Sequence, residues 1–199
     1  MKRLAATLFL GVLVALLVGT GVASAAGNAG QDSATGRVTD ATMVTFIEQP
    51  PICSPTFPFT CFPQPPLQVV TTADVDFSAK SSYNGTNPTG SARFTFRNED
   101  PDQVLTGEVT CLNVQGGTAI LSGPITEARG GSTLTVGTQT FEPRSFVITA
   151  IDSGKFSTQP DFIGFVLSPQ PATDVTCNTQ STTLDTVREG EVVVKDSLG

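Results

Sequence analysis

The chain has 199 residues, of which 39% are apolar and 15% charged, and it contains no histidine. Eleven basic and 18 acidic residues give a formal net charge of −7. This length and apolar content favour one compact domain with a core of ordinary size. The absence of histidine excludes Ser-His-Asp triads, Cys-His pairs, histidine metal sites and histidine pH switches.

Residues 1–25 have the pattern of a secretory signal peptide. Lys2 and Arg3 form a short basic start, residues 4–18 are apolar and uncharged, and residues 23–25 offer a small-residue cleavage site. Cleavage there leaves 9 basic and 18 acidic residues, a net charge of −9. We therefore expect a secreted, extracellular or cell-wall-associated protein whose mature chain does not insert into a membrane. Nucleic acid is not an expected partner, because this charge repels phosphate.

The mature chain is interpreted as a flexible leader at residues 26–34 followed by a single domain at residues 35–199, which opens with a strand near residues 36–48. A Pro- and Phe-rich segment at residues 50–66 comes next and holds seven of the prolines. Proline cannot donate to a β-ladder, so this segment is not a central strand. We predict an excursion between two strands that serves either as a recognition loop or as a cap on the domain, with Phe57, Phe59 and Phe62 as its aromatic groups.

Period-two alternation dominates the rest of the chain. Residues 73–80 and 92–97 alternate apolar with polar side chains, as half-buried antiparallel strands do. Four segments are more apolar on both faces, which is typical of strands nearer the centre of a sheet: residues 104–114, 118–125, 146–151 and 162–167. Turn formers separate these segments, and residues 191–195 form a last strand. The pattern predicts an all-β, disulfide-bonded domain, either an antiparallel β-sandwich or a β-barrel.

The four cysteines of an exported chain are expected to form two disulfides. Three pairings are formally open. We favour Cys53 with Cys61, which flank one short loop, and Cys111 with Cys177, which lie in or beside strand-like sequence far apart in the chain. A metal site or catalytic thiol is the alternative, but C-x7-C without histidine lacks the usual zinc spacing.

Carboxylates are the remaining candidates for chemistry. Glu108 lies inside a markedly apolar strand, and Asp74 and Asp76 share one face of another, so a two-carboxylate hydrolase is one hypothesis. The alternative is that all three face solvent on alternating strands. No catalytic residue is assigned.

Two acidic turns are candidates for calcium, which prefers oxygen ligands. Asp and Asn also stabilise turns through local backbone hydrogen bonds, which is the competing interpretation. No metal site or cofactor is assigned, and the candidate ligands are Glu99, Asp100 and Asp102 in one turn, and Asp152 and Asp161 around the other.

Three segments carry a resemblance to a known family: residues 91–97, residues 105–114 with the core Thr-Cys-Leu-Asn-Val, and residues 117–126. The chain resembles, over roughly residues 75–196, a family of secreted β-rich proteins of unknown function found mainly in actinobacteria. The resemblance extends to the turn at residues 152–154, to Cys177 and to the final strand from Gly190. It implies secretion and supports the Cys111–Cys177 pairing, but brings no activity. The segment at residues 53–61 departs from the family.

We therefore predict a non-catalytic extracellular or cell-envelope domain that binds an unknown extracellular ligand or envelope component. The alternatives are a carboxylate-based extracellular glycoside hydrolase that uses Glu108, and a small-molecule-binding barrel. The sequence leaves the ligand and the oligomeric state open.

Overall fold

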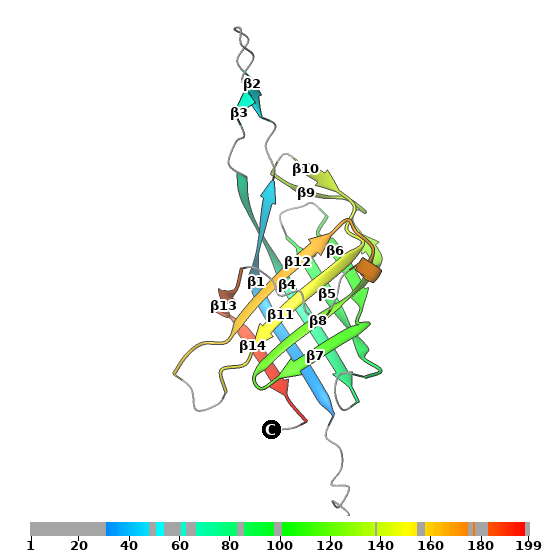
Figure 1. Ribbon diagram of the computed structural model, residues 1–199, viewed down its shortest axis with the longest axis vertical. Helices are drawn as coiled ribbons and strands as arrows, with labels where there is room; N and C mark the ends of the chain where they lie inside the picture. Colours follow the sequence, from blue (N-terminus) through cyan, green and yellow to red (C-terminus); the bar gives the residue numbers. More distant parts are fainter. Residues whose placement is uncertain are drawn as a thin grey trace, which may run out of the picture.

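The computed structural model describes residues 31–47, 51–53, 61–62, 67–82, 86–97, 101–137, 139–154, 158–174, 177 and 183–197. As predicted, the regular structure of these residues is almost entirely β-strand (Figure 1). The strands are β1 (Asp32–Ile47), β2 (Ile52–Cys53), β3 (Cys61–Phe62), β4 (Leu67–Ser81), β5 (Thr89–Phe96), β6 (Gln103–Glu108), β7 (Cys111–Gln115), β8 (Thr118–Arg129), β9 (Leu134–Val136), β10 (Gln139–Phe141), β11 (Ser145–Ile151), β12 (Phe162–Ser168), β13 (Asp185–Thr186) and β14 (Gly190–Lys195). A short 3-10 turn, η2 (Ala172–Asp174), follows β12.

The predicted signal peptide at residues 1–25 lies outside the described residues. β1 begins at Asp32, inside the segment predicted as a flexible leader, because Asp32, Ser33 and Ala34 pair with β4. None of the helical structure in the described ranges has the length and apolar character that a membrane span requires.

The described part of the chain contains one 10-stranded antiparallel sheet. Its path is β13-β12-β11-β8-β6-β5-β4-β1-β14, and β7 pairs with β8 off this path. Two small pairs, β9–β10 and β2–β3, form separate ladders. Since most neighbours in the sheet are also neighbours in the chain, the topology is largely a meander of hairpins.

The sheet curls until its two ends meet. β13 and β14 follow each other in the chain but lie at opposite ends of the sheet path, so the segment that contains them spans from β12 to β1. Val187 N–H donates to the Asp161 carbonyl at 2.8 Å, and Thr39 N–H donates to the Glu189 carbonyl at 3.1 Å. Of the two predicted architectures, the structure therefore has a barrel-like curled sheet.

The carboxylates of Asp152 and Asp161 complete this closure. β14 pairs with β1 along one edge. On the β12 side, Val194 N–H donates to Asp152 Oδ2 at 3.0 Å and Val192 N–H donates to Asp161 Oδ2 at 3.4 Å. The two aspartates thus satisfy backbone donors that a neighbouring strand would otherwise satisfy.

The inside of the curled sheet is packed with apolar side chains. The ring of Phe94 lies 5.3 Å from the ring of Phe165 and 5.6 Å from that of Phe146, measured between centroids. All three side chains are buried. Gly107 leaves room for Phe146, because a Cβ at this glycine would lie 2.5 Å from the Phe146 ring. Other buried residues of this core include Val38, Met43, Val75, Leu105, Leu121, Ile148, Ile163 and Val192.

The outward face of β8 and β11 is also buried, as their two-sided apolar sequence predicts. Ser122, Ser145, Val147 and Thr149 are each at most 5% exposed. The chain after β12 lies against this side, since η2 contacts β8 and Cys177 is bonded to Cys111 of β7.

Candidate functional site

Beyond the barrel, β1 and β4 continue as a two-stranded ladder. Residues 41–47 of β1 pair with residues 67–73 of β4, whereas β5 pairs with β4 from Asp74 onward. The hairpin of β2 and β3 lies further out along the same direction (Figure 1). We call residues 41–47, 51–53, 61–62 and 67–73 the arm.

A disulfide ties the hairpin of the arm. Cys53 and Cys61 are directly paired in the β2–β3 ladder, with their Cα atoms 4.0 Å apart, and they are bonded to each other. Cys111 is bonded to Cys177 across 66 residues of sequence. Both bonds follow the pairing favoured from the sequence. Two disulfides are typical of proteins in oxidising, non-cytoplasmic compartments.

The arm carries exposed apolar side chains. Ile52 and Phe62 face each other in the ladder next to the disulfide and are 60% and 64% exposed. Val70 is 57% exposed. Among the described residues, the other large hydrophobic side chain with such exposure is Leu184, at 40%. Exposed apolar groups therefore gather on the arm, which is typical of interaction sites.

The arm is also almost free of charge. Between Ala41 and Ala73 the sequence contains one ionisable charge, on Glu48, in a chain with 11 basic and 18 acidic residues. Within the part of the chain that the structure describes, the acidic side chains therefore lie outside the arm. A partner that contacts the arm meets little electrostatic repulsion from it.

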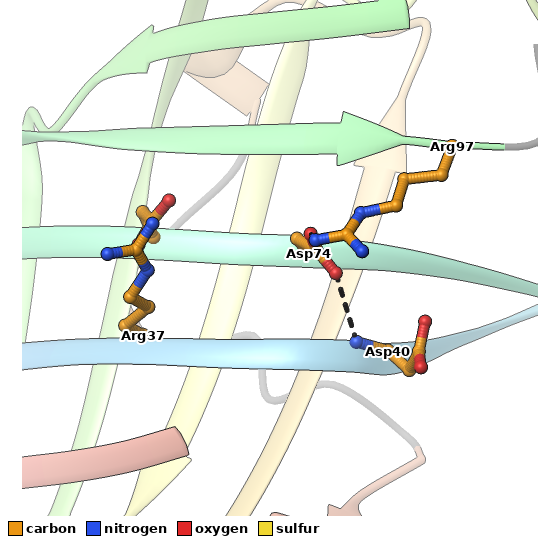
Figure 2. A network of polar contacts seen from close by, with 5 residues as sticks. Arg37, Asp40, Asp74 and Arg97 are labelled. Carbon is orange, nitrogen blue, oxygen red and sulfur yellow. Dashed lines mark hydrogen bonds and ion pairs between the residues drawn. The ribbon is translucent and has the colours of Figure 1, made fainter. Parts of the chain in front are cut away.

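Polar contacts fix the root of the arm (Figure 2). A β-bulge lies between Val38 and Ala41, where Asp40 has a φ of 55°. Asp40 N–H donates to Asp74 Oδ1 at 3.3 Å, and the Asp74 carboxylate also pairs with Arg97. The bulge sets the direction in which the arm leaves the barrel, and these contacts hold it.

A second ion pair joins β4 to β1. Arg37 Nε of β1 lies 3.1 Å from Asp76 Oδ1 of β4. Asp74 and Asp76, which the sequence offered as members of a carboxylate pair, are thus both engaged by arginines on the outer face. Glu108 is exposed on β6.

The predicted recognition residues lie partly on this arm. Phe62 is exposed at the hairpin, whereas Phe57 and Phe59 lie outside the described residues. Residues 41–47 fall in the strand predicted near residues 36–48, but the sequence pattern did not predict that they pair with residues 67–73 on the far side of the excursion. The composition of both segments could have indicated this ladder, because they are uncharged and rich in Val and Thr, as strands are.

Among the described calcium candidates, Asp152 and Asp161 approach the same turn, and Asp102 lies elsewhere in the fold, after β5. Asp152 and Asp161 bind backbone N–H groups of β14, and they also bind the turn at residues 153–154: Asp161 Oδ1 accepts from Ser153 N–H and Asp152 Oδ1 from Gly154 N–H. Asp102 is exposed, and Glu99 and Asp100 lie outside the described residues. Within the residues described, no three His, Cys, Asp or Glu side chains are grouped so as to hold a metal ion. The contacts of Asp152 and Asp161 fit the turn-stabilising interpretation.

Comparison with protein-family models, curated proteins and solved structures found no match for this chain. The resemblance to secreted actinobacterial proteins therefore stays a prediction.

Proposed function

We propose that this protein is a secreted, non-catalytic binding domain in which the barrel is a rigid support and the arm contacts the partner. The observation that carries this proposal is the gathering of Ile52, Phe62 and Val70, each more than half exposed, on one uncharged extension of an acidic molecule. Exposed apolar groups that are not needed for the core are a recurrent feature of docking surfaces.

The construction of the arm suits binding. The Cys53–Cys61 bond and the ladder of residues 41–47 with 67–73 restrict its backbone before any partner arrives. A restricted segment loses less conformational entropy when it binds, so more of its contact energy contributes to affinity. The contacts of Asp40 and Asp74 at the root extend this restriction to the barrel.

The charge distribution indicates the kind of partner. The arm offers apolar and hydroxyl groups with little charge, and the rest of the mature chain is strongly acidic. We therefore propose an uncharged component of the extracellular matrix or cell envelope, and not a nucleic acid or an anionic lipid surface.

Co-sedimentation with purified actinobacterial cell walls tests the proposal. The double substitution Ile52→Ser and Phe62→Ser should lower the bound fraction about tenfold, since the loss of apolar anchors costs about 1–2 kcal/mol. Leu184→Ser is the matched control, because it removes an exposed leucine that is not one of the arm residues and directly precedes β13. If the double variant sediments like the wild type, or the control loses as much, the arm is not the binding element.

A further inference from the structure

A polar pocket lies at the root of the arm, separate from the exposed apolar groups. It has a volume of about 430 Å³, which is in the range of small-molecule sites. It is bounded by the bulge of β1 on one side and by the closing segment of the barrel on the other. The described residues that line it include Thr39, Asp40, Thr42, Thr72, Asp185, Thr186, Arg188 and Glu189.

One carboxylate of the pocket is held in place. Thr42 Oγ1 donates to Asp185 Oδ2 at 2.6 Å, and Thr186 N–H donates to Asp185 Oδ1 at 2.8 Å. The Thr42 hydrogen bond, followed by the Thr186 N–H and the charge of Arg188, lowers the pKa of Asp185 below its usual value of 3.8. This carboxylate is therefore ionised at neutral pH, and Arg188 offsets its charge.

Two further carboxylates of the pocket are not neutralised. The side chains of Asp40 and Glu189 have no hydrogen-bond or ion-pair partner among the residues described here. Figure 2 shows the Asp40 carboxylate pointing away from Asp74, while the Asp40 backbone N–H is bound to Asp74. The backbone of Asp40 is thus held by Asp74, and its carboxylate is free to accept hydrogen bonds.

We propose that this pocket binds a small organic cation with several hydrogen-bond donors, such as an amine that carries hydroxyl groups. The carboxylates of Asp40 and Glu189 accept from the ammonium group, as in other charge-assisted hydrogen bonds. The hydroxyl groups of the ligand face the threonines that line the rest of the pocket. Thr42 and Thr72 of the arm contribute to this pocket, but Ile52, Phe62 and Val70 do not line it. A negative result at the pocket therefore does not test the proposed binding by these exposed apolar side chains.

Nuclear magnetic resonance titration of the ¹⁵N-labelled mature protein tests the site. The probe is glucosamine under mildly acidic conditions, where its amine is protonated, and the comparison ligand is neutral N-acetylglucosamine. We expect saturable shifts of the Thr39, Asp40 and Thr186 amides with glucosamine and weaker binding of the neutral amide. Equal binding of the two sugars, or no saturable shift, would overturn the proposal.

Two variants are expected to change the affinity for glucosamine in opposite directions. Misfolding would lower the affinity in both, so it cannot produce this result. Asp40→Asn with Glu189→Gln keeps the shape of both side chains, and Asn also tolerates the positive φ of this position. It should weaken glucosamine binding about tenfold. Arg188→Ala removes a positive charge and should strengthen binding about twofold. Glu108→Gln, on the exposed face of β6, is the neutral control. A loss of binding in Arg188→Ala would contradict the proposed electrostatics.

Discussion

The barrel and the arm share the strands β1 and β4 but expose them differently. In the barrel, β4 lies between β1 and β5, and its inward side chains Val75 and Phe77 are buried. In the arm, β4 pairs with β1 only, and Val70 is more than half exposed. Val70 lies on the outward face of β4, the face that carries Asp74 and Asp76 in the barrel. The same face of one strand is therefore covered by ion-paired carboxylates on the barrel and by an exposed apolar side chain on the arm.

The largest difference in the free energy of unfolding is expected between substitutions of two phenylalanines, one in the barrel and one on the arm. Phe94→Ala should lower the free energy of unfolding by about 3–5 kcal/mol, because Phe94 is fully buried against two other rings. Phe62→Ala should change it by no more than about 0.5 kcal/mol, since Phe62 is exposed on the arm. Urea unfolding of both variants measures the difference, and equal losses would mean that the arm belongs to the cooperative core.

Removal of each disulfide in turn compares the stability of the barrel with that of the arm. Cys111→Ala with Cys177→Ala should cost about 4 kcal/mol, since this bond closes a separation of 66 residues in the unfolded chain. Cys53→Ala with Cys61→Ala should cost about 1 kcal/mol or less, because the short hairpin lies on the arm and gains freedom in the folded protein too. Thermal and urea unfolding give both values; a larger loss from the arm disulfide would reverse the comparison.

The closing strand of the barrel is expected to depend on side-chain carboxylates. Asp152→Asn should lower the free energy of unfolding by about 1.5 kcal/mol, because it weakens a charge-assisted hydrogen bond from Val194 N–H. Hydrogen exchange at the Val194 amide should quicken as well. The exposed Asp102→Asn is the control, with a change within about 0.5 kcal/mol. An unchanged exchange rate at the Val194 amide would show that the Asp152 carboxylate does not hold β14.

The smallest effect is a pH dependence at the root of the arm. The pKa of Asp185 is lowered, mainly by the Thr42 hydroxyl, so the contact stabilises the folded state above pH 3.8 and is lost as the pH falls through the folded-state pKa. The urea midpoint of the wild type should fall when the pH is lowered from neutral to below 3.8, and in Thr42→Val this fall should be smaller. An equal fall of the urea midpoint in both proteins would show that the Thr42–Asp185 hydrogen bond does not contribute to the pH dependence.

The sequence predicted the all-β class because residues 73–80 and 92–97 alternate without error, and it favoured both disulfide pairings. It did not choose between sandwich and barrel, because alternation does not specify how a sheet closes. That closure depends on Asp152 and Asp161, whose partners Val194 and Val192 lie far away in the chain. The arm was predicted only in part. Residues 41–47 fall in the strand expected near residues 36–48, but the prolines of residues 50–66 predicted irregular structure and did not indicate that residues 67–73 pair with this strand.

Hydrogen–deuterium exchange of the protein, with and without the purified cell walls used for co-sedimentation, tests the central claim most directly. If the arm is the docking element, added protection falls on residues 51–53, 61–62 and 67–73, and exchange in β8 and β11 stays unchanged. Protection of the outer face of the barrel with an unchanged arm would contradict it.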